Sequence, residues 1–96
     1  MKVDTNKPIV GTLWPLPNRS VSVKQPLTIL AGALDLTSGI ASVDFYVDGV
    51  KLGTDTTGLF TYTWKPVLGK HTISLVATDL AGNTATSSTT SVTVVR

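Results

Sequence analysis

The residues able to do chemistry in this sequence are few, and their spacing matches none of the common catalytic arrangements. Nucleophilic catalysis needs a base beside the nucleophile and a group that orients the base. The 96 residues include one histidine, His71, and no cysteine. No serine stands in a G-x-S-x-G turn, and zinc binding is disfavoured by the same shortage of histidine and cysteine. We therefore expect a protein that is not an enzyme and has no catalytic residues.

Aspartates in turns are the second candidate chemistry, because Ca²⁺ takes about six to eight oxygen ligands from carboxylates, amides, carbonyls and water. If successive strands alternate in direction, several acidic turns meet at one end of the fold, with Asp55 among them. The predicted calcium ligands there are Asp4, Asp35, Asp79 and Asn83. The alternative is that these residues only form turns, since Asp and Asn side chains hydrogen-bond the local backbone and tolerate left-handed conformations. Both interpretations stay open, and no cofactor other than this calcium ion is expected.

Trp14 is the third candidate, as an aromatic platform for carbohydrate. Flat aromatic faces bind the apolar faces of sugar rings, and Trp14 is followed by the proline-rich sequence Pro15-Leu16-Pro17. The alternative is that Trp14 caps an open edge of the core or packs on a neighbouring domain. Trp64 is assigned to the core, because Phe60 and Tyr62 share its period-2 spacing.

The composition predicts that strands position these residues. The chain is 42% apolar and 15% charged, and it is rich in threonine and valine, which favour strands. Alternating apolar and polar residues predict strands at 27–31, 43–48, 50–54, 60–64, 73–77 and 92–94, with edge strands near 8–13 and 21–23. About seven short antiparallel strands with regular turns predict an all-β sandwich of immunoglobulin type and no helix.

The turns predict where the ends of the chain lie. Asp48-Gly49 between alternating runs is a strong hairpin signal, because a type I′ turn needs positive φ at both central residues. Counting strand directions from this hairpin places the two ends of the chain at opposite ends of the sandwich.

The length predicts one domain at 8–96, preceded by a linker remnant at 1–7 that is polar and ends at Pro8. No segment has the roughly 20 apolar residues of a membrane span, and the start of the chain lacks the apolar run of a signal peptide. The formal net charge is +2, and the basic residues form no run. We expect a monomer that binds neither nucleic acid nor a membrane.

Two long motifs resemble the bacterial Ig-like domains. They are Ser42–Asp55 (SVDFYVDGVKLGTD) and His71–Thr84 (HTISLVATDLAGNT), and the segments at 4–10 and 60–64 are similar to the family as well. These domains are repeated modules of secreted glycoside hydrolases, subtilisin-like proteases and surface adhesins. The resemblance implies an Ig-type sandwich, an extracellular setting and a spacer or accessory role. Trp14 departs from the family, which usually has a small polar residue before this proline.

Three functions are therefore weighed against one another. The leading hypothesis is a non-catalytic accessory or spacer module of a secreted or cell-surface bacterial multi-domain protein, with neighbouring domains of the same chain as its partners. The alternatives are a module that binds an insoluble polysaccharide through Trp14, and an adhesin repeat stiffened by calcium.

Overall fold

The computed structural model describes residues 7–35, 39–56 and 60–96, which form nine strands and no helix. The predicted linker at 1–7 falls almost entirely outside these ranges and stays a prediction. The strands are β1 (Ile9–Trp14), β2 (Arg19–Ser22), β3 (Leu27–Leu34), β4 (Ile40–Val47), β5 (Val50–Asp55), β6 (Thr61–Trp64), β7 (Gly69–Asp79), β8 (Thr84–Thr86) and β9 (Thr90–Val95).

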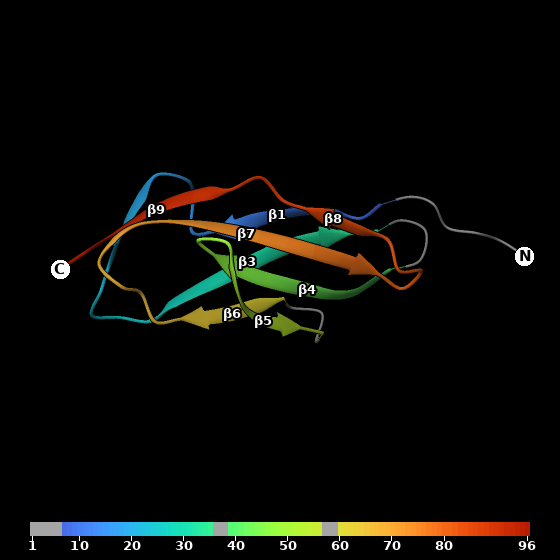
Figure 1. Cartoon of the computed structure of the whole chain (residues 1–96), viewed down its shortest axis with the longest axis horizontal. Coiled ribbons are helices and arrows are strands. Elements are labelled where there is room, and N and C mark those ends of the chain that lie inside the picture. The colour runs from blue at the N-terminus through green and yellow to red at the C-terminus, as the bar shows by residue number, and fades with distance from the viewer. Residues whose placement is uncertain (1–6, 36–38, 57–59) are drawn as a thin grey trace, which may run out of the picture.

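The strands form two sheets, which confirms the predicted all-β sandwich (Figure 1). The smaller sheet has the order β1-β3-β6, and the larger has the order β2-β9-β7-β4-β5, with β8 also paired to β7. Two details differ from the prediction. The short strand β8 was not expected, and β2 pairs with β9 in parallel rather than antiparallel. The parallel pair arises because the chain leaves the smaller sheet after Trp14 and joins the edge of the larger one at Arg19.

The core lies between the sheets and consists of the inward residues of the alternating strands. Phe45 is fully buried and stacks on Tyr62 of the opposite sheet, with ring centroids 5.8 Å apart. Trp64 is 8% exposed, which confirms its assignment to the core. The buried apolar residues are Leu27, Ile29, Ala31, Val43, Phe45, Val47, Phe60, Trp64, Ile73, Leu75, Ala77, Val92 and Val94.

The predicted Asp-Gly hairpin is confirmed between β4 and β5. Val47 pairs with Val50, so Asp48 and Gly49 form a two-residue loop with φ of 53° and 80°. Both values are positive, as a type I′ turn requires. This turn fixes the direction of the Asp48 side chain, which projects toward β7.

The strand registers place the start of β1 and the end of β9 far apart in the sandwich. Ile9 at the start of β1 pairs with Leu34 at the end of β3, whereas the end of β9 pairs with the beginning of β7 through Val94 and Gly69. Figure 1 shows β1 starting toward one end of the long axis and the C-terminus at the other. The molecule measures 55 × 21 × 19 Å along its principal axes.

Ser87 fills the gap between β8 and β9 on the edge of β7. Its backbone N–H donates to the Leu75 carbonyl at 2.8 Å, and its hydroxyl accepts the Leu75 N–H at 2.9 Å and donates to the Ser88 carbonyl. A side chain thus replaces the missing ladder bond. We expect Ser87→Ala to lower the free energy of unfolding by about 1–3 kcal/mol, because a buried N–H loses its acceptor. Urea unfolding measures this, and the exposed Ser88→Ala is the matched control; equal stability of both variants would contradict the role of the hydroxyl.

Candidate functional site

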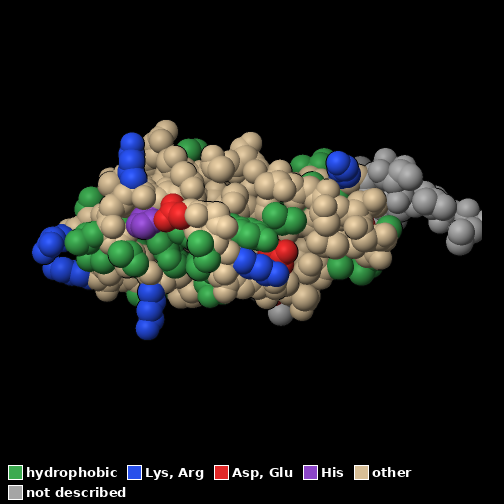
Figure 2. Space-filling model, viewed as in Figure 1, with side chains coloured by type: hydrophobic (Ala, Val, Ile, Leu, Met, Phe, Trp, Pro, Cys, Tyr) green, Lys and Arg blue, Asp and Glu red, His purple; other side chains and the backbone are tan. Residues whose placement is uncertain are grey.

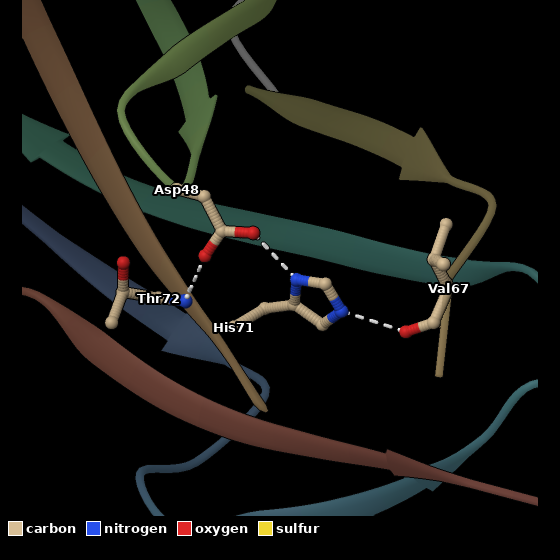
Figure 3. A network of polar contacts seen from close by, with 4 residues as sticks. All are labelled: Asp48, Val67, His71 and Thr72. Carbon is tan, nitrogen blue, oxygen red and sulfur yellow. Dashed lines mark hydrogen bonds and ion pairs between the residues drawn. The ribbon is translucent and has the colours of Figure 1, made fainter. Parts of the chain in front are cut away.

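His71 lies on β7 with both ring nitrogens engaged (Figure 3). Nδ1 is 2.6 Å from Oδ2 of Asp48, and Nε2 is 2.7 Å from the carbonyl oxygen of Val67. The other Asp48 oxygen accepts the Thr72 N–H at 2.9 Å. The Trp64 ring meets the imidazole edge to face, with centroids 5.2 Å apart. The histidine therefore ties the β4–β5 hairpin to β7 and to the loop before it.

The two partners of His71 are both acceptors, so the imidazolium, which donates from both nitrogens, satisfies both. The hydrogen bond to Asp48 raises the pKa of His71 above its ordinary value, and burial opposes this while the Val67 carbonyl adds to it. The hydrogen bond from His71 lowers the pKa of Asp48, and the Thr72 N–H lowers it further. Figure 2 shows the histidine beside an acidic side chain on the surface.

This geometry makes His71 a poor catalytic base and a poor metal ligand. A small hollow of about 110 Å³ beside it is lined by Asp48, Lys70, Thr72 and Ser91. Ser91 and Thr72 supply the hydroxyl groups of this lining, yet both nitrogens of His71 already contact Asp48 and Val67. No free nitrogen is left to take a proton from Ser91, as a nucleophile–base pair requires.

The pair predicts a stability that depends on pH. Because the folded-state pKa of His71 is raised, its contribution is full below about pH 6.5 and is lost as the pH rises through the folded value. The Asp48 contribution has the opposite sign and is lost on acidification below about pH 4. We expect the melting temperature of the wild type to fall between about pH 6 and pH 9.

Asp48→Asn separates charge from turn geometry, because asparagine also tolerates positive φ. We expect its melting temperature to vary less with pH over the same range, and His71→Gln to behave alike. Calorimetry at several pH values measures both. If the melting temperatures of the wild type and of Asp48→Asn changed equally with pH, a charged pair between Asp48 and His71 would be contradicted.

Asp79 organises the turn after β7. It is 1% exposed; Oδ1 accepts the N–H groups of Ala81 and Asn83 at 3.0 and 2.7 Å, and Oδ2 accepts the Asn83 side-chain amide at 3.0 Å. Burial raises the pKa of this carboxyl, but hydrogen bonds from Asn83, with Asp35 and from Ala81 outweigh it, so the pKa lies below its ordinary value. The carboxylate acts as the acceptor for a turn, as the second interpretation of the aspartates proposes.

The predicted calcium ligands are brought together only in part. Asp35, Asp79 and Asn83 meet at one end of the sandwich, through the hydrogen bonds of Asp79. Asp55 accepts the N–H of Thr61 at 2.9 Å, and Asp4 lies outside the described residues. Within the described ranges no three His, Asp or Glu side chains gather as a metal site would require. Calcium binding stays a prediction.

Trp14 lies on the outer face of the smaller sheet. It pairs with Leu30, which points away from the core because its neighbours Ile29 and Ala31 are buried. The Trp14 side chain is 44% exposed, whereas Pro15 is fully buried. The indole therefore does not close an edge of the core, and the two remaining interpretations, a sugar platform and a contact with a neighbouring domain, both place a partner against it.

The described part of the chain contains no helix with the length and apolarity needed to cross a membrane. On the face seen in Figure 2, the basic side chains stand apart from one another. The hollow near the end of β6, of about 350 Å³, is open and lined by Val23, Lys24, Gln25, Pro26, Lys65 and Pro66. Its lining holds no carboxylate, hydroxyl or thiol side chain.

A sandwich of these two sheets, without a catalytic constellation among its described residues, defines a module of immunoglobulin type. The chain belongs to the bacterial Ig domain family, whose model matches residues 8–94. This confirms the resemblance drawn from the two motifs.

Solved structures agree with this assignment. The chain is similar to the CbhA fibronectin(III)-like modules of Clostridium thermocellum (36% identity, TM-score 0.78, covering 92% of this chain and 45% of that one). It is also similar to part of a modular endo-β-1,4-mannanase from Cellulomonas fimi (25% identity, TM-score 0.68, 92% and 18%). An endo-β-1,4-mannanase from Thermotoga petrophila shares the fold (14% identity, TM-score 0.72, 97% and 21%). The chain spans less than half the length of each of these proteins, and a search of curated proteins gave no match.

Proposed function

We propose that the chain is a non-catalytic accessory module that holds neighbouring domains apart in a secreted or cell-surface bacterial protein of the glycoside hydrolase type. The observation that carries this proposal is the placement of the start of β1 and the end of β9 at opposite ends of an elongated sandwich. A module with this geometry adds its own length between the domains that it joins.

The comparisons support the multi-domain context. Modules of this type occur as parts of longer chains, among them two endo-β-1,4-mannanases. The chemistry of the described residues supports the absence of catalysis, because the one histidine is held by two acceptors. An extracellular location is proposed from the same relatives.

The spacer role is tested by the distance between the two ends. The sequence has no cysteine, so Lys7→Cys with Arg96→Cys gives two unique sites for spin labels. We expect pulsed electron paramagnetic resonance to give one narrow distribution of distances between the two labels, centred close to the length of the sandwich. A broad distribution, or a short distance, would show that the module neither separates its ends nor fixes them.

A calcium-stiffened repeat is the second candidate function, and the meeting of Asp35, Asp79 and Asn83 at one end favours it. Since a ligand that binds only the native state raises the melting temperature, this function predicts an upward shift at about millimolar calcium relative to chelator. Asp35→Asn is the variant that should lose the shift. Identical melting with calcium and with chelator would remove this candidate.

A further inference from the structure

The outer face of the smaller sheet is free of charge. On β1, β3 and β6, the residues opposite the inward-facing positions point away from the core, and none of those described is ionisable. They are Ile9, Gly11, Leu13, Trp14, Thr28, Leu30, Gly32, Leu34, Thr61 and Thr63. Ile9, Leu13 and Leu34 are each more than half exposed. An apolar face of this extent marks an interaction site more often than an ordinary surface.

A β-bulge builds the centre of this face. Thr12 pairs with Ala31 and Trp14 with Leu30, so β1 has one residue more than β3 at this point. The extra residue is Leu13, whose side chain lies over Gly32, where a built Cβ would be only 3.1 Å away. Two consecutive side chains, Leu13 and Trp14, therefore lie on the same face, which regular alternation forbids.

The backbone at Trp14 is ordered on both sides along the chain. The ladder with β3 precedes it, and the fully buried Pro15 follows it. A residue whose backbone is already ordered loses less conformational entropy when it binds. Across the sheet the row continues from Trp14 to Leu30 and then to Thr61, with Thr28 and Thr63 paired beside it. One half of the face is apolar, and the other half presents hydroxyl groups.

We propose that this face binds the flat surface of an uncharged, β-1,4-linked polysaccharide, with Trp14 and Leu13 against the C–H faces of the sugar rings and the threonines beside the hydroxyl edges. The inference rests on the proposed accessory role only for the choice of polymer. An extended β-1,4-linked chain is a ribbon with apolar faces and polar edges, which is the pattern of this sheet.

The absence of charged side chains among the described residues on the outer face of the smaller sheet favours a neutral polysaccharide over an acidic polymer or a protein as its ligand. The outer face of the larger sheet carries charged groups, with Lys51 Nζ 3.5 Å from Asp44 Oδ1. The smaller sheet offers no charge to an acidic polymer. It has one tryptophan, no arginine and several threonines, whereas the centres of protein interfaces are enriched in several aromatic residues and arginine. A neutral polymer of hydroxylated rings fits this composition better than a protein does.

The test is retention of the purified chain on microcrystalline cellulose and on insoluble β-1,4-mannan. We expect retention of the wild type on at least one of them, and a loss of about tenfold for Trp14→Ala, as when one aromatic anchor is removed. Thr28→Lys, which adds a charge to an exposed position, should lose retention as well. Tyr46→Ala is the matched control, because it removes an aromatic ring from the outer face of the larger sheet and should leave retention unchanged.

Thermal melting of each variant tests whether it is folded, so that a loss of binding can be distinguished from a loss of structure. Equal retention of the wild type and Trp14→Ala, or none on either polymer, would overturn the inference. Concentration-dependent self-association that Trp14→Ala abolishes, without retention, would assign the face to a second copy instead. Each of these outcomes leaves the spacer role standing, because the distance between the labelled ends tests that role separately.

Discussion

Phe45→Ala should lower the free energy of unfolding by about 3–5 kcal/mol, the cost of truncating a large buried aromatic side chain. Phe45 is fully buried between the sheets and stacks on Tyr62, so its removal opens a cavity that neither sheet can close alone. Urea unfolding followed by tryptophan fluorescence measures the change, since Trp64 lies in the same core.

Val50→Ala is the control for this variant. Val50 is 63% exposed on β5, and its truncation should change the free energy of unfolding by less than about 0.5 kcal/mol. A loss below about 1 kcal/mol for Phe45→Ala would mean that the two sheets do not share this core.

Gly53→Val should destabilise the fold by about 1–3 kcal/mol, or more, through overpacking. Gly53 pairs with Phe45 on β4, and a Cβ at this position would lie 2.6 Å from Cε2 of Tyr62. The Tyr62 ring cannot move away freely, because it is stacked on Phe45. The absence of a side chain at Gly53 therefore lets the two sheets approach at this edge.

Gly11→Val is the matched control, because a Cβ at Gly11 would have no neighbour within 4 Å. Valine favours strands, so this variant should be as stable as the wild type or slightly more stable. Chemical unfolding of both variants compares them directly. If Gly53→Val were no less stable than Gly11→Val, the close approach of Tyr62 would be contradicted.

The core could be predicted from sequence because each inward residue follows a local period of two. Val43, Phe45 and Val47 alternate with polar residues, and all three are buried. The Asp-Gly turn could be predicted for the same reason, because its signal lies in two adjacent residues. By contrast, β8 and Ser87 were missed, because a buried serine that replaces a ladder bond carries no apolar signal. The parallel pairing of β2 depends on a crossing between sheets, which periodicity does not encode.

The candidate sites could not be predicted from local patterns, because they depend on the register between strands that are far apart in the sequence. Asp48 and His71 are 23 positions apart, and they meet only because Val47 pairs with Ile73 across β4 and β7. The sequence does not show that β4 pairs with β7 and not with β6, the strand that follows the hairpin. The direction of Trp14 depends on the bulge at Leu13, which shifts the alternation by one residue and leaves no mark in the sequence. The meeting of Asp35 with Asp79, on the other hand, followed from counting strand directions.

The most direct test of the account is whether the purified chain catalyses any reaction. Hydrolysis of β-1,4-mannan, cellulose, model esters and a peptide substrate should proceed at the rate of the buffer alone, because the imidazole of His71 is fixed between Asp48 and Val67. Turnover that follows the protein through gel filtration and disappears with His71→Gln would contradict a non-catalytic module.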